Sequence, residues 1–478
     1  MNTGAPWPGL DEARARVLGM QAKLHRWAGE DAARRFDDVF NLVADPAFLT
    51  VAWDRVSTNT GARTAGVDGI KPGWIAAVGA AEAFLADVRA QLKTGTFVPV
   101  VVREVTIPKP GTSKRRRLGI PTVTDRVVQA ALKLVLEPIF EADFQPCSYG
   151  FRPNRRAHDA IAEVQFYATR GYEWVLEADI EACFDSIDHT ALMDRVRRRV
   201  ADKRVLLLVK AFLKAGVLTE PGQREESITG TPQGGILSPL LANIALSALD
   251  EHFVAQWQQQ MGTSGRRVLR RRKGLGTWRL VRYADDFVVM VFGDHAIAQA
   301  LREQVADLIA PLGLRLAEAK TRVVHIDEGF DFLGYRIQRH RQRGTSRRYV
   351  YTMPSRKAVA AVKAKVRALT NRSRSYDLAE LLHRVNAVLR GWANYFRHGV
   401  SKRFFSKVDA FTWWRIVRWI RKRRNGLGWK ATRRRFMQGW KIVADGISFT
   451  GASPVAIVRY RYRGERIPTP WAASAATS

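Results

Sequence analysis

The stretch that most constrains this chain is RLVRYADDFVVMVF (279–292), in which two adjacent aspartates interrupt apolar, β-branched sequence. Adjacent carboxylates repel each other, and burying an unpaired one is costly. Side chains of a straight strand alternate between its two faces, so Asp285 and Asp286 cannot both face one site from the middle of a strand. A hairpin that reverses at this pair removes the conflict. The sequence therefore predicts two strands joined by a tight turn, with Asp285 pointing into a cleft and Asp286 beside it.

A third carboxylate, Asp179, follows the apolar residues Trp174, Val175 and Leu176, as expected for an acid at the exposed end of a buried strand. Converging carboxylates repel unless they are protonated or bridged by cations, and Mg²⁺ prefers such oxygen ligands. Two metal ions about 3.5–4 Å apart can stabilise the attacking and leaving oxygens of phosphoryl transfer. Paired acids also serve glycoside hydrolysis at separations of ~5–9.5 Å, but that chemistry does not account for the charge of this chain.

The 478 residues include 78 Lys and Arg against 45 Asp and Glu, a net charge of +33. This excess favours a polyanionic partner, with nucleic acid first and an anionic membrane surface second. We find no apolar run of ~18 residues and no signal peptide, which predicts a cytoplasmic protein with no membrane partner. The two cysteines, Cys147 and Cys183, form no disulfide framework or zinc-finger spacing, and we expect both to be buried.

The basic residues are concentrated in three segments, 266–282, 336–374 and 397–441, of which the first two contain no acid and the third only Asp409. The third segment is interleaved with tryptophans: Trp413, Trp414, Trp419, Trp429 and Trp440. Basic side chains neutralise phosphates, whereas aromatic side chains pack the core or stack on bases. We expect most of these tryptophans to be core residues and the basic side chains to bind nucleic acid.

Strands and helices are mixed without strict βαβ alternation, which predicts an α+β fold with helices on an antiparallel sheet. Helical periodicity covers the segments 11–56, 81–95, 125–141 and 296–314, and most of the chain from about 355 to 440. Strands are expected at 97–108, at the start of 175–187 and near 321–326, with a basic turn at 108–119.

An apolar stripe at three- and four-residue spacing runs through the later helical region: Leu381, Leu382, Val385, Val388, Leu389, Trp392 and Phe396. We expect this stripe to pack in the core. The opposite, basic face would then carry Arg384, Arg390 and Arg397 toward RNA.

A long series of motifs occurs in a fixed order: GVDG (66–69), IPKPG…KRRRLGIPTVTDRVVQ (107–129), SYGFRPNRRAHDA (148–160), ADIEACFDSIDH (178–189), GTPQGGILSPLLANIALSALD (230–250), YADD (283–286), LAEAKT (316–321) and FDFLGY (330–335). This series resembles the fingers and palm of a reverse transcriptase of the group II intron type. RGWANYFRHG (390–399) resembles the maturase, or thumb, segment of that family, and RYRYRGERIPTPW (459–471) is also similar to it. The resemblance covers about residues 50–471.

The resemblance implies a right-hand polymerase, with α+β fingers and palm followed by an all-helical thumb. We expect five parts: an N-terminal helical extension (1–58), fingers and palm (59–350), the thumb or maturase domain (351–410), a basic, Trp-rich nucleic-acid-binding region (411–471) and a disordered tail (472–478). The chain has no CxxC pair, so we expect it to lack the zinc-supported H-N-H endonuclease domain of many family members.

The family's motifs also imply roles for individual residues. Asp179, Asp285 and Asp286 match the catalytic carboxylates, and two Mg²⁺ ions would be held by Asp179, Asp285 and the carbonyl of Ile180. The residues matched to the incoming nucleotide are Lys109 and Arg117 at the triphosphate, Phe184 as the aromatic gate that excludes a 2′-hydroxyl, Gln233 near the sugar, and Lys320. Arg115 and Arg116 compete with Arg117 for the triphosphate role.

The function implied is an RNA-directed DNA polymerase that also binds group II intron RNA and assists splicing and target-primed mobility. Its partners would be the intron RNA, an RNA template with a DNA primer, target DNA and dNTPs. The expected RNA and DNA contacts are Arg384, Arg390, Arg397, Arg433, Arg434 and Arg435. Three alternatives remain: a splicing-only maturase, a related enzyme recruited by the host for defence, repair or a CRISPR locus, and RNA-dependent RNA synthesis.

Overall fold

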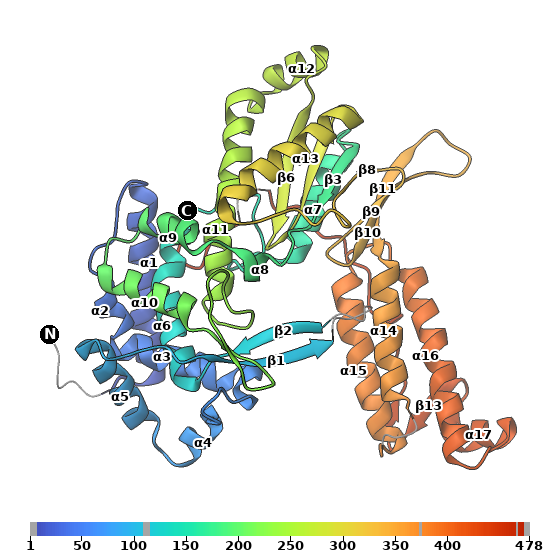
Figure 1. The fold of residues 1–478 in the computed structure, drawn as a ribbon. Helices are drawn as coiled ribbons and strands as arrows, with labels where there is room; N and C mark the ends of the chain where they lie inside the picture. The colour runs from blue at the N-terminus through green and yellow to red at the C-terminus, as the bar shows by residue number, and fades with distance from the viewer. Residues whose placement is uncertain (1–6, 109–114, 372–374, 465–466, 473–478) are drawn as a thin grey trace, which may run out of the picture.

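The computed structural model describes residues 7–108, 115–371, 375–464 and 467–472 (Figure 1). Helices α1–α6 and the hairpin β1–β2 lie on one side of the view, and the long helices α14–α16 lie on the other (Figure 1). A four-stranded sheet joins these two helical parts. The arrangement is the mixed helix-and-sheet fold, followed by a helical region, that the sequence predicts.

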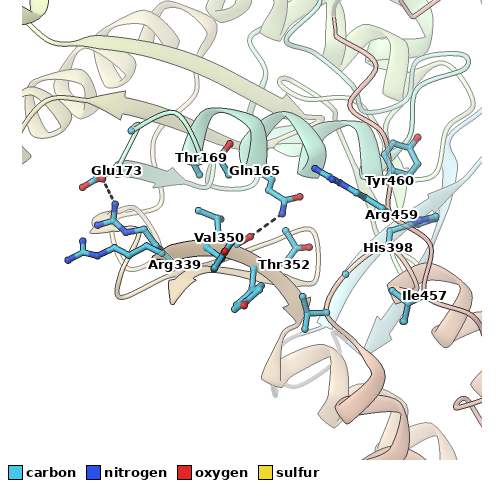
Figure 2. Close-up of a pocket in the computed structure, with 17 residues that line it drawn as sticks. Gln165, Thr169, Glu173, Arg339, Val350, Thr352, His398, Ile457, Arg459 and Tyr460 are labelled. Carbon is cyan, nitrogen blue, oxygen red and sulfur yellow. Dashed lines mark hydrogen bonds and ion pairs between the residues drawn. The ribbon is translucent and has the colours of Figure 1, made fainter. Parts of the chain in front are cut away.

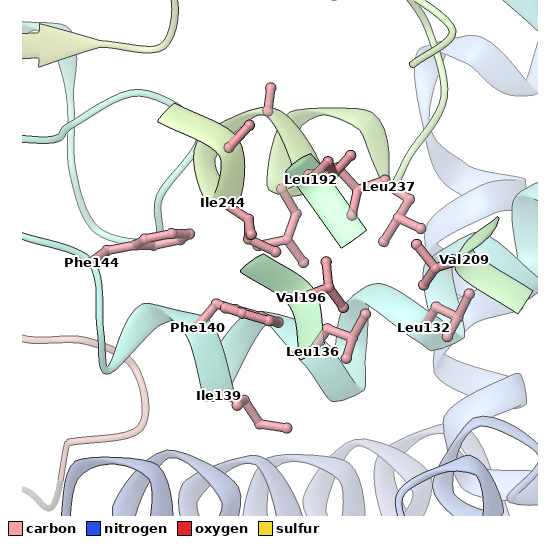
Figure 3. Packing of buried hydrophobic residues seen from close by; sticks show 14 of the residues in the cluster. Leu132, Leu136, Ile139, Phe140, Phe144, Leu192, Val196, Val209, Leu237 and Ile244 are labelled. Atoms are coloured by element: carbon pink, nitrogen blue, oxygen red, sulfur yellow. The ribbon is translucent and has the colours of Figure 1, made fainter. Parts of the chain in front are cut away.

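The N-terminal helices pack on α6 (Val123–Glu141), which is buried along almost its whole length. They are α1 (Leu10–Glu30), α2 (Phe40–Val43) and α3 (Pro46–Thr58), which confirms the helices expected in residues 11–56. Figure 3 shows Leu132, Leu136 and Phe140 of α6 meeting apolar side chains of α9–α11. The other helical elements before the central hairpin are η1 (Thr60–Arg63), α4 (Pro72–Ala77), α5 (Ala81–Thr94), α7 (Ala157–Ala168), α8 (Cys183–Ser186), α9 (His189–Arg197), α10 (Lys203–Lys214), α11 (Ser238–Gln256), η2 (Trp257–Met261) and α12 (Ser264–Arg272).

The hairpin of β1 and β2 differs from the sequence prediction at both ends. β1 spans Val102–Pro108, so the expected strand at 97–108 begins five residues late; Pro99 has no backbone N–H for a strand ladder. β2 spans Arg115–Ile120 and pairs antiparallel with β1, so half of the expected basic turn at 108–119 is strand. The short strands β4 (Val217–Leu218) and β5 (Arg224–Glu225) complete this sheet in the order β2-β1-β4-β5.

The central sheet has the order β6-β7-β3-β8 and is antiparallel throughout. Its strands are β3 (Trp174–Ala178), β6 (Thr277–Tyr283), β7 (Asp286–Phe292) and β8 (Arg322–His325). Successive residues of β7 enter different cores: Val289 packs in the cluster that includes α11 and α13 (His295–Ile309), which is followed by η3 (Ala310–Leu312), whereas Val288 packs in the cluster that includes α7. Because both faces are covered, the strand is a continuous apolar run.

The sheet β9 (Phe330–Phe332), β10 (Tyr335–Arg341) and β11 (Arg348–Pro354) leads into the helical part. There α14 (Arg356–Leu369), α15 (Leu378–Phe396) and α16 (Lys402–Arg423) pack around the predicted apolar stripe. Leu381, Leu382, Val385, Leu389 and Phe396 are buried, which confirms its core role. The expected divisions at 350/351 and 410/411 both fall inside continuous elements, β11 and α16.

The C-terminal segment packs on helices from earlier in the chain, α7 and α1. After α17 (Trp429–Phe436) and the small sheet β12 (Met437–Gln438), β13 (Lys441–Ala444) and β14 (Ile447–Ser448), the C-terminal segment crosses α7, where Arg463 pairs with Asp159. Trp471 then reaches α1 and donates to Gln21 (3.2 Å). Residues 473–478, most of the expected disordered tail, lie outside the described residues. Over the described ranges, no helix combines the length and apolarity needed to cross a bilayer.

Candidate active site

The β6–β7 hairpin carries the aspartate pair as predicted. Tyr283 pairs with Asp286 across the hairpin, so Ala284 and Asp285 form a two-residue turn. Ala284 has a φ of 59°, the left-handed backbone that such a turn requires. Gly150 lies against the turn, and a Cβ there would stand 2.3 Å from the Ala284 nitrogen, so no larger residue fits. The tight reversal therefore depends on a glycine more than 130 residues away.

A buried arginine supports the turn from below. Arg282 donates to Oδ1 of Asp250 (2.7 Å), to Asn243 (2.9 Å) and to the hydroxyl of Ser148 (2.7 Å). It also donates to the carbonyl of Ala284 (2.9 Å), within the turn itself. Sequence reasoning assigned no role to these residues. The available signal was Arg282 itself, a charge inside an otherwise apolar strand.

The neighbouring strand brings Asp179 to the same edge of the sheet. β3 pairs with β7 so that Ala178 lies opposite Phe287, and continuing this register sets Asp179 beside Asp286. The structure therefore places together the three carboxylates that the sequence predicts to converge. Lys320, from the segment after η3, forms an ion pair with Asp179. This lysine supplies one positive charge to three negative ones.

Burial, and next the charges of neighbouring carboxylates, raise the pKa values of Asp285 and Asp286. Burial raises the pKa of Asp285, the charge of Asp179 raises it further, and Arg116 and Lys320 oppose the rise. Desolvation by the surrounding protein, together with Asp285 and Asp179, raises the pKa of Asp286 to about 6, although its side chain remains accessible. Bound divalent cations would relieve this repulsion, and hard carboxylate oxygens suit Mg²⁺. The donor set thus fits such a metal.

The geometry of a closed metal cage is not formed in the described part of the chain, where no three His, Cys, Asp or Glu side chains are grouped around one point. Asp179 is turned to Lys320 instead. Ile180 follows Asp179 in an isolated bridge to Leu316 whose hydrogen bonds use the Asp179 carbonyl and the Glu181 amide rather than the Ile180 carbonyl. These groups are available for a cation but are not yet arranged around one.

The residues expected around the nucleotide lie next to this edge. Phe184 of α8 meets Phe151 edge to face, with centroids 6.3 Å apart. Gln233 donates to Oδ2 of Asp185, the residue after Phe184 (2.7 Å). The amide of Thr231 also donates to the Phe184 carbonyl (2.6 Å). The loop that carries Gln233 is therefore held against the helix that carries Phe184.

Arg116 and Arg117 are neighbours in β2 and therefore point to opposite faces of the β1–β2 hairpin. Arg117 pairs with Glu104 and with Glu225 (2.6 Å), so two carboxylates hold the guanidinium expected at the triphosphate. Arg116 points to the other face of β2 and lowers the pKa of Asp285 through its charge, against the larger effect of burial. Of the two, Arg116 is the arginine that acts on the carboxylate site in this structure. Lys109 lies outside the described residues.

Comparison with known proteins agrees with this geometry. Residues 107–337 match the model "Reverse transcriptase (RNA-dependent DNA polymerase)", and residues 359–440 match "Group II intron, maturase-specific domain". Protein YkfC of Escherichia coli K12 is 38% identical over 361 residues, which cover 72% of this chain and 93% of YkfC. The chain belongs to the group II intron reverse transcriptase and maturase family.

Other members of the family are longer. The group II intron-encoded protein LtrA of Lactococcus lactis subsp. cremoris is 35% identical over 378 residues, 70% of this chain and 61% of LtrA. A 91 kDa protein in the cob intron of Schizosaccharomyces pombe is 27% identical over 434 residues, 77% of this chain and 52% of that protein. The match to the reverse transcriptase family identifies the chain as an RNA-directed DNA polymerase, a class of enzyme that works with divalent metal ions.

The maturase-specific region contains the arginines expected to contact RNA. Arg390 is exposed on α15, on the face opposite the buried stripe. Arg384 is exposed but pairs with Glu380 (2.7 Å) and lies over the ring of Tyr376 (4.6 Å). Arg397 is only partly exposed. Arg433, Arg434 and Arg435 are exposed on α17.

A hollow of about 680 Å³ lies away from the carboxylates, between α7, β11 and the C-terminal segment. In Figure 2, Arg459 extends from that segment toward α7, Gln165 donates to the Val350 carbonyl, and Arg339 pairs with Glu173 at the far end. Glu173 begins the approach to β3, whereas Asp179 follows the end of that strand. The hollow therefore lies where β11 and the C-terminal segment meet α7, at the other end of β3 from the candidate active site.

Proposed function

We propose that this chain extends DNA primers on RNA templates with dNTPs, and that Asp179, Asp285 and Asp286 form its catalytic centre. The observation that carries the proposal is the β3–β7 register, which brings Asp179 to the turn of Asp285 and Asp286. Such a cluster at the edge of a rigid sheet holds the reacting groups in place, and positioning with electrostatic stabilisation accounts for most of the rate of phosphoryl transfer.

The carboxylates would hold two Mg²⁺ ions through Asp179, Asp285 and the carbonyl of Ile180. When bound, these ions stabilise the attacking primer oxygen and the departing pyrophosphate oxygen. Lys320 neutralises Asp179 while the carboxylates are free of metal. The raised pKa of Asp285, caused first by burial and then by Asp179, supports a cation in the working enzyme.

The incoming nucleotide would be bound by groups that surround this centre. Arg116 and Arg117 would bind the triphosphate together with Lys109, because each guanidinium group can donate two parallel hydrogen bonds to the oxygens of a phosphate group. Phe184 would lie under the sugar and leave no room for a 2′-hydroxyl. Gln233, fixed by Asp185, would contact the sugar side of the nucleotide.

The maturase-specific region would bind group II intron RNA, assisting splicing and target-primed mobility in the cytoplasm. Support comes from the match at residues 359–440 and from the exposed arginines Arg390, Arg433, Arg434 and Arg435. A helical thumb beside the primer–template duplex would read shape and 2′-hydroxyls rather than base sequence. Target DNA would follow the same basic surface.

Primer extension tests the polymerase proposal. The wild-type chain should extend a DNA primer on an RNA template with dNTPs and Mg²⁺, and chelation of the metal should stop it. Asp285→Ala should reduce extension below a tenth of wild type while RNA affinity, measured by filter binding, changes less than about twofold. Retained extension by Asp285→Ala would remove this residue from the catalytic centre.

Sequencing of the RNA that co-purifies from the native host tests the intron role. One dominant structured RNA that contains the coding region of this protein, with a spliced-exon junction in the cell, is the expected result. A mixed population of cellular RNAs would favour a host-recruited polymerase instead. Splicing without any primer extension would favour a splicing-only maturase.

A further inference from the structure

α17 and β13 lie at the end of the helical part farthest from the central sheet (Figure 1). Four tryptophans carried by α16, α17 and the β12–β13 turn contact one another through their rings. This Trp patch consists of Trp413 and Trp414 of α16, Trp429 at the start of α17, and Trp440 in the turn between β12 and β13. Ring centroids of Trp414 and Trp429 are 6.3 Å apart with planes inclined by 28°. Trp429 and Trp440 are also 6.3 Å apart, inclined by 37°. Trp429 thus lies between Trp414 and Trp440, and Trp413 contacts all three rings.

Two rings of the patch are exposed, and the patch is fixed in place by its contacts. Trp414 is 55% exposed and Trp440 is 64% exposed, whereas Trp419 on the same helix is buried. Trp413 packs edge-on against Trp414 and donates from Nε1 to the Trp440 carbonyl (3.0 Å), which fixes the turn to the helix. The prediction that most of these tryptophans pack in the core is confirmed for Trp419, which is buried, and for Trp413 and Trp429, which pack against the core; Trp414 and Trp440 are the exposed exceptions. Exposed contiguous aromatic surface of this kind marks an interaction site.

The charge around the patch identifies the chemistry of its partner. From residue 410 to residue 444 the sequence contains eleven Lys and Arg and no Asp or Glu. Arg433 lies over the Trp440 ring, with its guanidinium carbon 5.0 Å from the centroid, and Lys430, Arg434 and Arg435 are exposed on the same short helix. Flat aromatic faces beside unneutralised cations complement unpaired bases joined by phosphates. A duplex would offer its phosphates but not its base faces.

We infer, building on the proposed function, that the Trp patch binds unpaired nucleotides of a single strand, with bases stacked on Trp414 and Trp440 and phosphates on the arginines of α17. The chemistry is shared by single-stranded RNA and single-stranded DNA. A single strand held here lies apart from the carboxylate centre, so the patch anchors RNA or DNA and takes no part in nucleotide addition.

The test is the affinity of the full chain for a short unstructured RNA at several salt concentrations. The double variant Trp414→Ala/Trp440→Ala should bind about tenfold or more weakly, since each base–aromatic stack is worth ~1–3 kcal/mol. The dependence of affinity on salt should stay unchanged, because no charge is removed. Trp74→Ala is the matched control: Trp74 is 62% exposed on α4, outside the patch, and its removal should change nothing.

Two further measurements separate stacking from other causes. Trp414→Phe/Trp440→Phe should retain most of the affinity, which a folding defect in the alanine variant would not explain. Arg434→Gln/Arg435→Gln should weaken binding and reduce its salt dependence. Photo-crosslinking of thiouridine-containing RNA should label the peptides that contain Trp414 and Trp440.

Several results would overturn the inference. Equal affinity of the wild type and the alanine variant for the single strand would do so. Crosslinks confined to peptides without Trp414 or Trp440 would also overturn it. So would an alanine variant that binds duplex RNA more weakly but binds the single strand as the wild type does. Self-association or vesicle binding that the alanine variant loses, with RNA affinity unchanged, would assign the patch to a protein or membrane partner. Parallel assays with single-stranded DNA of the same sequence identify the preferred strand. Primer extension by the wild type reports separately on the proposed polymerase function.

Discussion

Arg282 and Asp250 form an ion pair that is entirely shielded from solvent directly beneath the turn that carries Asp285, with Nε of Arg282 2.7 Å from Oδ1 of Asp250. The same guanidinium holds the carbonyl of Ala284 (2.9 Å). A catalytic carboxylate at a hairpin tip needs a rigid support, because its function depends on position. The buried pair supplies that support and links the hairpin to α11.

Removing Asp250 should destabilise the fold. Asp250→Ala leaves a buried guanidinium without its partner, and breaking such a pair costs about 3–5 kcal/mol of the free energy of unfolding. Urea denaturation measures the loss. Arg14→Ala, which breaks the exposed pair of Arg14 with Asp54, is the control and should cost less than about 1 kcal/mol. Equal losses of unfolding free energy in the two variants would show that the Arg282–Asp250 pair does not stabilise the fold.

Metal affinity should fall at low pH. The pKa of Asp286 is raised to about 6, by desolvation first and by Asp285 and Asp179 next, and bound Mg²⁺ requires ionised carboxylates. As the pH falls through about 6, Asp286 takes up a proton, and the carboxylate cluster loses negative charge that attracts Mg²⁺. Mg²⁺ titrations of primer extension at pH 5.5 and 7.5 should show an apparent affinity several-fold weaker at the lower pH. Asp286→Asn, which lacks this titrating group, should flatten the difference; an unchanged pH profile would contradict the prediction.

Phe184 should control the choice of sugar. Phe184→Ala opens space at the position matched to the 2′-carbon and should raise the efficiency of ribonucleotide incorporation relative to dNTPs by about tenfold or more, a difference of ~1.4 kcal/mol. Competition between the matched dNTP and NTP in single-nucleotide extension measures this ratio. Phe151→Ala, which removes the ring that packs edge-on against Phe184, is the control and should change the ratio less. Unaltered discrimination in Phe184→Ala would place the gate elsewhere.

Arg116 and Arg117 should differ in their effects. Arg116 acts on the carboxylate site, whereas Glu104 and Glu225 already hold Arg117. Arg116→Ala should raise the KM for dNTPs about tenfold or more, and Arg117→Ala should raise it less, because its guanidinium is committed to two carboxylates. Steady-state extension over a range of dNTP concentrations compares the two. The reverse order would restore Arg117 as the principal triphosphate ligand.

Much of the local structure could be predicted because it depends on neighbours in the chain. The reversal at Asp285 followed from the two faces of a strand, and the buried stripe of α15 from its three- and four-residue spacing. Convergence of Asp179 with Asp285 followed from an acid placed at the end of an apolar run. The start of β1 at Val102 could not be predicted, because the strand-like sequence pattern begins at residue 97, before the residues that pair with a neighbouring strand.

The sequence by itself determined the periodicities, the positions of the carboxylates and the excess of positive charge. Only the tertiary structure decided which charges are neutralised. It pairs Arg117 with Glu104 and Glu225, turns Lys320 to Asp179, and leaves Trp414 and Trp440 exposed while it buries Trp419. Each of these outcomes depends on contacts between segments far apart in the chain. Periodicity assigns a residue to a face, but burial and charge pairing depend on what the rest of the fold brings against that face.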